Sequence, residues 1–189
     1  MTTTVRGRPR SEACDRAIEA ATIELLVEDG FGGMSMEKIA ARAGVGKATI
    51  YRRWETKEAL VVDAVGHHCL EDAPAPSTGS ARADLLDMLH HFADRARRDG
   101  ALMQAFASER ERHPELAEAF RRTFLASRRA AARDVIERGV ASGELPATTD
   151  VELLADVGPA LIWHRLTVTG EPLTDDLPER IVAQFAPVP

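Results

Sequence analysis

Two short helical patterns separated by a glycine occupy residues 34–60, MSMEKIAARAGVGKATIYRRWETKEAL. Ile39 and Ala40 mark the packed face of the first, and Ile50 marks that of the second. Gly44 lies between them and tolerates the positive φ that a tight turn often needs. Because Ala40 is small, a second helix can cross closely above it. The segment therefore predicts a helix-turn-helix.

The second helix of this pair presents polar and basic side chains away from its packed face. Thr49 and Tyr51 can donate hydrogen bonds to phosphate oxygens, and neighbouring lysine and arginine residues add positive charge. Lys47 and Ala48 lie at its N-terminal end, which in helix-turn-helix proteins enters the major groove. There a lysine reaches O6 and N7 of guanine, and an alanine methyl meets the methyl of thymine. These residues predict a recognition helix for double-stranded DNA.

The rest of the chain also has helical patterns, bounded by capping and breaking residues. Ser11, Ser35 and Thr56 are good N-caps, and Gly30 is a good helix stop. We expect helices at about 11–30, 35–43, 46–54, 56–70, 81–98, 101–111, 114–140, 150–169 and 178–185. Residues 71–80 read as a linker, and residues 1–10 as a flexible basic arm. Without strand-like alternation, the predicted fold class is all-α with about nine helices.

Charge and composition are compatible with DNA binding by a local surface. The net charge is −6, but the basic residues between 38 and 57 outnumber the single acid Glu55. A local basic face attracts phosphate even when the whole chain is acidic. No apolar run is long enough for a membrane span, and no signal peptide precedes the first helix. Cys14 and Cys69 form no disulfide framework, so the cytoplasm is the expected location.

The segment 34–60 resembles the signature of the tetracycline-repressor (TetR) family, and the resemblance extends over about residues 11–70. The matching positions are Ser35, Ile39, Ala40, Ala43, Gly44, Val45, Tyr51, Trp54, Thr56, Lys57, Glu58 and Leu60. The sequence departs from the pattern at Gly46, where serine is common, and at Ala48, where glycine is common. Trp54 replaces the usual phenylalanine.

The resemblance implies a DNA-binding role for individual residues. Ser35, Thr49, Tyr51 and Lys57 would hold phosphates, and Lys47 and Ala48 would face bases. Arg52 and Arg53 would hold phosphates or reach a base edge, although Arg52 has an alternative partner in Glu55. Arg6, Arg8 and Arg10 would form an arm suited to an A·T-rich minor groove, or else a solubilising tail.

The resemblance also implies three parts: a DNA-binding domain at 1–60, a connecting helix and linker at 61–80, and a helical ligand-binding and dimerisation domain at 81–189. The helix 150–169 is apolar around much of its circumference, which favours it and the last helix as a homodimer interface. The expected interface residues are Leu154, Val157, Leu161, Ile162, Ile181, Val182 and Phe185. The expected pocket residues are His91, Phe92, Met103, Phe106, Phe120, Phe124, Trp163, His164 and Arg165.

The function implied is a repressor that binds a palindromic or pseudopalindromic operator as a dimer and is released by a small, mainly hydrophobic molecule. We expect no catalytic residues, no metal site and no cofactor. Enzyme motifs are missing, and the adjacent histidines of His67-His68 and His90-His91 point apart on a helix, so neither pair chelates by itself. The alternative is a small helical enzyme or adaptor that carries a helix-turn-helix. The sequence names neither the operator, the effector nor the regulated genes, and it does not separate repressor from activator.

Overall fold

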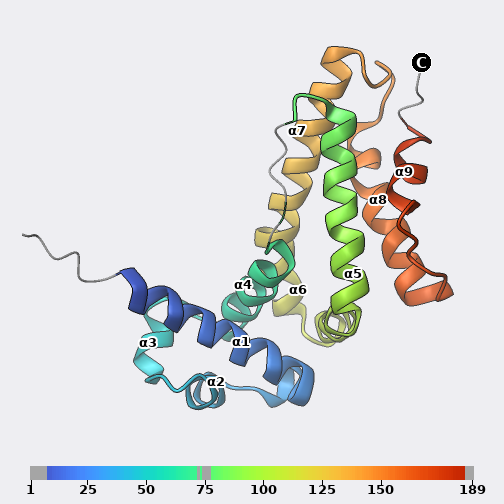
Figure 1. Ribbon diagram of the computed structural model, residues 1–189. Helices are drawn as coiled ribbons and strands as arrows, with labels where there is room; N and C mark the ends of the chain where they lie inside the picture. Colours follow the sequence, from blue (N-terminus) through green and yellow to red (C-terminus); the bar gives the residue numbers. More distant parts are fainter. Residues whose placement is uncertain (1–7, 72, 74–77, 186–189) are drawn as a thin grey trace, which may run out of the picture. The chain divides into compact units, whose positions relative to one another are not determined.

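The computed structural model describes residues 8–71, 73 and 78–185, and its regular elements are all helical (Figure 1). The predicted all-α class is confirmed. The elements are α1 (Arg8–Gly33), α2 (Met36–Arg42), α3 (Lys47–Tyr51), α4 (Lys57–Leu70), α5 (Ala81–Arg112), α6 (Pro114–Phe120), the π-helical η1 (Arg121–Leu125), α7 (Ala126–Ser142), α8 (Val151–His164), the π-helical η2 (Arg165–Thr169) and α9 (Leu177–Val182). Within these residues no helix has the length and apolar character that a membrane crossing requires.

The chain divides into two compact units. Unit 1 consists of residues 1–68 and 105–124, and unit 2 consists of residues 69–104 and 125–189. This division differs from the expected domain at 81–189, because the last residues of α5 and all of α6 belong to unit 1. One contact between these residues and α1 is a hydrogen bond of 2.9 Å from the backbone N–H of Phe31 to a carboxylate oxygen of Glu109.

The first helix begins earlier than the sequence suggested. It starts at Arg8 rather than after Ser11, since Pro9 suits a first turn, where its missing N–H would have had no partner. The break expected at Gly30 is present as a kink, with φ 68° and ψ 168°, before the helical path resumes to Gly33. A positive φ of this kind favours glycine.

The helix-turn-helix has the local geometry that its sequence predicted. Ser35 caps α2, its hydroxyl accepting a hydrogen bond of 3.2 Å from the N–H of Lys38. Gly44 takes φ 67° in the turn, and the Val45 N–H donates to the Ala40 carbonyl at 3.0 Å. The predicted cap of α4 is confirmed as well, because the Thr56 hydroxyl accepts from the N–H of Ala59 at 3.1 Å.

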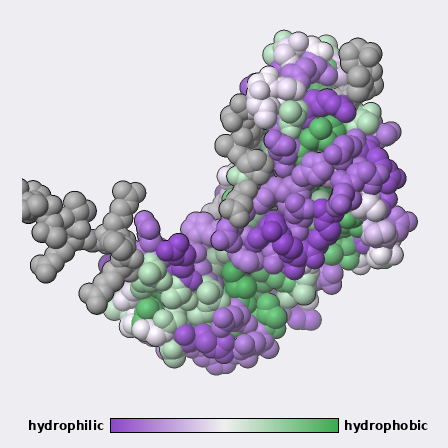
Figure 2. Space-filling model, in the orientation of Figure 1, coloured by the Kyte–Doolittle hydropathy of each residue, from purple (hydrophilic) through white to green (hydrophobic). Residues whose placement is uncertain are grey.

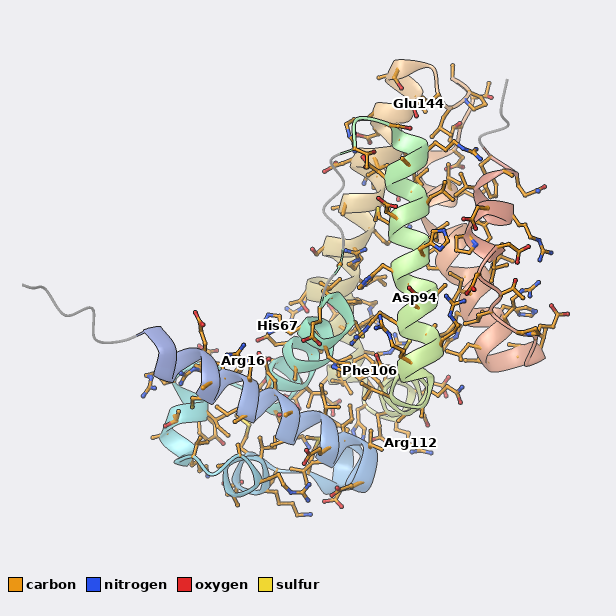
Figure 3. The ribbon with its side chains drawn as sticks, in the orientation of Figure 1. Arg16, His67, Asp94, Phe106, Arg112 and Glu144 are labelled. Atoms are coloured by element: carbon orange, nitrogen blue, oxygen red, sulfur yellow. The ribbon has the colours of Figure 1, made fainter. Side chains whose placement is uncertain are left out.

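Unit 2 is built around the first part of α5, with α7, α8 and α9 packed on it. Ile136 of α7 and Ile162 of α8 are fully buried at the centre of its two apolar clusters. At Gly158 of α8 an added Cβ would lie 2.5 Å from a methyl carbon of Leu89, so the Leu89 side chain would have to move to admit a larger residue. The N-terminus of α5 is capped from far along the chain by Glu144, labelled in Figure 3, whose carboxylate accepts from Ser80 Oγ at 2.7 Å and from two backbone N–H groups. The hydrogen bond from Ser80 is the main cause that lowers the pKa of Glu144 to about 2.

Several predicted helices are joined or interrupted differently. The two expected at 81–98 and 101–111 form one element, α5, which is kinked at Asp99 (φ −116°, ψ 21°). The helix expected at 114–140 contains the π-helical turn η1, and the one expected at 150–169 ends in η2. Proline lies in the first turn of both α6 and α9, as predicted from Pro114 and Pro178.

Candidate nucleic-acid interface

Helix α3 is anchored by one side chain and exposes several others. Ile50 is fully buried, whereas Lys47, Ala48, Tyr51 and Arg52 are exposed, Tyr51 to 45%. We call these four residues the α3 face. All four were predicted from the sequence as DNA contacts, and Thr49 between them is half-buried. The face offers two cationic groups, one phenol hydroxyl and one methyl group to a ligand.

Lys47 has an acidic neighbour that the sequence analysis missed. Its ammonium donates to a carboxylate oxygen of Glu37 in the first turn of α2, and lies 5.4 Å from the ring centroid of Tyr51. The hydrogen bond to Lys47 is the main cause that lowers the pKa of Glu37. The spacing of ten residues across a turn is not a helical spacing, so no local pattern indicates the pair.

Arg52 is the C-cap residue of α3, and it is exposed. The alternative pairing with Glu55 does not occur, since neither residue takes part in an ion pair anywhere in the described part of the chain. The guanidinium of Arg52 is therefore available to an external anion.

Arg53 points in another direction from Arg52. Its side chain is only 19% exposed, forms an ion pair with Asp15 of α1, and donates to the carbonyl of Thr49 at 3.1 Å. Residues next to each other on a helix face different ways, so one arginine of the pair lies against α1 while the other stays exposed.

Lys57 is held by backbone groups at the end of α1. Its ammonium donates to the carbonyl oxygens of Phe31 at 2.8 Å and of Met34 at 3.2 Å, and lies 3.9 Å from the centroid of the Phe31 ring. The side chain is half-buried. Lys57 therefore joins the start of α4 to the end of α1.

Phe31 is also contacted by Glu109 of α5 and by His113, the residue that follows α5. Glu109 accepts the Phe31 N–H, and the ring of His113 lies edge-on to the Phe31 ring with centroids 4.8 Å apart. Glu109 also pairs with Arg112, labelled in Figure 3, at 3.0 Å. Neither Glu109 nor His113 was predicted as a functional residue from the sequence.

The remaining cations of the helix-turn-helix are compensated by acids of α1. Lys38 pairs with Asp29 at 3.1 Å, and Arg42 pairs with Glu24 at 3.1 Å and with Glu28 at 2.8 Å. The exposed surface of α2 is accordingly hydrophilic (Figure 2) but contains both signs of charge. The positive surface expected from residues 38–57 is thus confined to a smaller area, because the sequence count left out the acids that α1 contributes.

The basic arm lies mostly beyond what the structure describes. Arg6 falls outside the described residues, and for Arg8 and Arg10 only the backbone, as the first turn of α1, is described.

The expected pocket residues are divided between the two units. In unit 1 the rings of Phe106, Phe120 and Phe124 form consecutive pairs with centroids 5.3 Å apart (Phe106 is labelled in Figure 3). Phe124 also packs on Gly66 of α4, where an added Cβ would lie 3.1 Å from its ring. The guanidinium of Arg110 lies 4.5 Å from the centroid of Phe120, an anchor that the sequence analysis missed.

The other expected pocket residues belong to unit 2. Phe92 and Met103 pack against the apolar cluster that contains Ile162. His91 contacts the carbonyl oxygen of Cys69 at 2.9 Å. Trp163 is half-buried and His164 exposed, while Arg165 pairs with Glu171 at 3.1 Å.

Most of the expected dimer residues pack inside unit 2. Ile162, Ile181 and Val182 are buried in its apolar clusters, and Leu154 and Phe185 pack against the same clusters. Leu161 is 43% exposed and Val157 is half-buried. Two residues absent from the prediction, Leu153 and Val168, are 60% and 69% exposed.

One histidine of the adjacent pairs meets carboxylates from two helices. His67 of α4, labelled in Figure 3, lies 2.7 Å from Glu19 of α1 through Nδ1 and 3.6 Å from Asp63 through Nε2. The hydrogen bond to Glu19 is the main cause that raises the pKa of His67. Each ring nitrogen of His67 therefore faces a carboxylate. A separate feature is the thiol of Cys69, whose pKa burial raises to about 11. The thiol is therefore a poor nucleophile at neutral pH.

Comparison with known proteins gives matches over both halves of the chain. Residues 18–64 match the family described as bacterial regulatory proteins, tetR family, and residues 75–185 match the tetracyclin repressor-like C-terminal domain. The HTH-type transcriptional regulator YdeS of Bacillus subtilis is 36% identical, with 90% of this chain and 86% of the relative covered. The DNA-binding transcriptional repressor TetR of Mycobacteroides abscessus is 31% identical, with 92% of each chain covered.

Two solved structures are also similar to this chain over most of its length. The TetR family transcription regulator SCO0332 is 31% identical, with a TM-score of 0.71 and with 92% of this chain and 96% of that chain covered. The flavonoid-responsive regulator FrrA is 28% identical, with a TM-score of 0.64 and with 90% and 91% covered.

The contacts of Lys57 lead to a prediction about stability. We expect Lys57→Met to lower the free energy of unfolding by about 1–3 kcal/mol, because it leaves the carbonyls of Phe31 and Met34 without their donor. The control is Lys47→Met, which loses an exposed ion pair and a contact with the Tyr51 ring and should lower the free energy of unfolding clearly less than Lys57→Met. Urea denaturation followed by circular dichroism measures both. Equal effects of the two substitutions would contradict this role of Lys57.

Proposed function

The chain belongs to the tetracycline-repressor family, and from this premise we propose that it is a ligand-responsive repressor that binds its operator as a dimer in the cytoplasm. Its relatives are transcriptional regulators, which leaves the alternative of a small helical enzyme without support. The observation that carries the proposal is the α3 face, with its exposed Lys47, Tyr51 and Arg52 on a helix-turn-helix anchored to α1 and α4.

For the DNA contacts, we assign two kinds of role to the predicted residues. Lys47 and Ala48 would face bases, while Tyr51 and Arg52 would hold phosphates, together with Thr49 and the N-terminus of α2 capped by Ser35. Arg53 and Lys57 would act mainly by fixing α3 and α4 to α1, because both side chains already have partners there. The arginines of the arm would add phosphate or minor-groove contacts.

Dimerisation would use the outward side of α8 and η2. Leu153, Val157, Leu161 and Val168 follow one another at spacings of four, four and seven residues, which places them along one side of a helix. Three of them are exposed, at 60%, 43% and 69% for Leu153, Leu161 and Val168. Exposed apolar side chains aligned in this way are typical of an interface. A two-fold dimer would present two α3 faces to half-sites about 34 Å apart or a multiple of it.

The effector would bind next to the aromatic rings of unit 1. Phe120 and Phe124 stack with an angle of 28° between their planes, and Phe124 packs on Gly66 in the middle of α4. A ligand that displaces Phe124 would therefore act directly on the helix that follows the recognition helix. FrrA is described as a flavonoid-responsive regulator, and since flavonoids are aromatic, this description supports an aromatic ligand. His91, Trp163, His164 and Arg165 belong to unit 2, and we leave them out of this proposed site.

The first prediction of this proposal concerns DNA affinity. We expect Arg52→Ala and Tyr51→Ala to weaken binding to all duplexes alike, and Arg52→Ala to reduce the salt dependence by about 0.9 log unit per log unit of salt. Fluorescence anisotropy with DNA upstream of the protein's own coding region, measured over a salt series, gives both quantities. Lys38→Ala is the control, because its cation is paired with Asp29. A salt slope that Arg52→Ala leaves unchanged would remove Arg52 from the interface.

The second prediction concerns assembly. We expect Leu161→Asp to give monomers in sedimentation velocity, because a carboxylate within an apolar interface loses its hydration without gaining a partner. The control is Val27→Asp on α1, which places the same charge at another exposed apolar residue, 55% accessible. A dimer that survives Leu161→Asp would place the interface elsewhere.

The third prediction concerns release. With quercetin, a flavonoid, as the probe, we expect displacement of operator DNA from the wild-type protein and a weaker response from Phe120→Leu, which loses the ring stack. Because coupling is reciprocal, DNA should weaken quercetin binding by the factor by which quercetin weakens DNA binding. Phe185→Leu in the core of unit 2 is the control. An equal loss of response in both variants would refute the assignment to the rings of unit 1.

A further inference from the structure

Next to the α3 face lies an acidic residue, Glu37, whose presence phosphate binding alone does not explain. Glu37, in the first turn of α2, is exposed and forms an ion pair with Lys47, the first residue of α3. An acid beside the cations that bind DNA repels phosphate and so lowers affinity. The other cations of the helix-turn-helix have partners elsewhere. Lys38, Arg42 and Arg53 all form ion pairs with acids of α1.

The positions of the two charged groups are fixed by the helices that carry them. Ser35 caps α2 two residues before Glu37, and the hydrogen bond from Val45 to Ala40 lies in the turn between the helices. The ammonium of Lys47 donates to the Glu37 carboxylate and lies 5.4 Å from the centroid of the Tyr51 ring. A donor and an acceptor are therefore held next to each other, at the end of the recognition helix that enters the major groove.

In the major groove, a G·C base pair presents a matching set of groups. Guanine offers two acceptors, O6 and N7, and the cytosine opposite offers a donor, its N4 amino group, directly beside O6. Lysine is a preferred partner of the guanine acceptors, and glutamate accepts from cytosine N4. An A·T pair offers the lysine no second adjacent acceptor, since adenine places an amino group beside N7.

We propose that Glu37 and Lys47 together read one G·C base pair in each half-site, with Lys47 donating to guanine O6 and N7 and Glu37 accepting from cytosine N4. This inference rests on the proposed DNA-binding function and adds the base specificity to it. Glu37 is then a specificity-determining residue. It lowers the affinity for other base pairs, because none of them presents a donor directly beside two adjacent acceptors in this order.

The test is a binding matrix of protein variants and operator variants. The proteins are wild type, Glu37→Gln, Lys47→Ala and the double variant, and the operators carry each base pair of the half-site changed in turn. For the wild type we expect one G·C pair whose replacement weakens binding about tenfold. Glu37→Gln and Lys47→Ala should each remove most of that preference at the same pair, and the double variant should lose little more than either single variant. Operator DNA with 7-deazaguanine at this position should weaken the wild type but not Lys47→Ala.

Glu55→Gln is the matched control, because it removes the same charge from an exposed residue that follows α3 and takes part in no described ion pair. It should change the affinity for all operators alike. Thermal unfolding of each variant verifies that the fold is kept. The proposal is overturned if Glu37→Gln behaves like Glu55→Gln, which would mean that Glu37 acts only through its charge. It is also overturned if the two single variants lose preference at different base pairs.

The outcomes also separate this inference from the proposed function. If Lys47→Ala and Glu37→Gln weaken or strengthen binding to every operator equally, the α3 face still binds DNA and only the reading of the G·C pair fails. If neither variant changes binding to any operator, the α3 face is not the DNA contact, and the proposed function loses its main support together with this inference.

Discussion

Phe31 joins three helices of unit 1 through its backbone N–H, its backbone carbonyl and its ring. Its N–H donates to Glu109 of α5, its carbonyl accepts from Lys57 of α4, and its ring contacts both Lys57 and His113. The residue follows Gly30, whose positive φ turns the chain at the end of α1 and whose own Cβ position is closed by Glu109 at 3.2 Å. A buried phenylalanine contributes several kcal/mol to stability, and here its polar backbone groups are satisfied by side chains from other helices. The position of α4, and with it the support beneath α3, depends on this junction.

The junction also explains why α5 contributes to both units. Residues up to Gln104 pack with α8 and α9, whereas Glu109 reaches the end of α1. Phe106, one turn before Glu109, begins the aromatic series that continues through Phe120 to Phe124 and reaches Gly66 of α4. The aromatic rings and the junction at Phe31 therefore act on the same helix, α4, one near its middle and one at its start. A ligand can shift the equilibrium between two conformations of a protein only through contacts that differ between them. A helix contacted by both groups of residues is suited to such a shift.

Local sequence signals predicted the fold well, while contacts between distant residues escaped them. The caps Ser35 and Thr56, the turn at Gly44 and the prolines at the starts of α6 and α9 act within a few residues of themselves, so the sequence reveals them directly. The exposed Lys47, Ala48, Tyr51 and Arg52 followed from the same local spacing. In contrast, the inward direction of Arg53 depends on Asp15, and the burial of Ile162 depends on how α8 meets α5 at Gly158. No local pattern indicated the role of Glu109, because its partner Phe31 is 78 residues away.

The cations of the helix-turn-helix fall into two groups with different contacts, and this difference affects how the protein can evolve. Arg42, Arg53 and Lys57 bind groups of α1 and support the scaffold, whereas Arg52 and the pair of Lys47 and Glu37 contribute little to it. Exposed residues of the second kind can be exchanged at almost no cost in folding free energy. A gene copy can therefore acquire preference for a different target site through a few neutral steps, without passing through poorly folded intermediates. The same separation makes the surface suitable for grafting, since a foreign reading surface can be installed on this scaffold while its ion pairs with α1 stay intact.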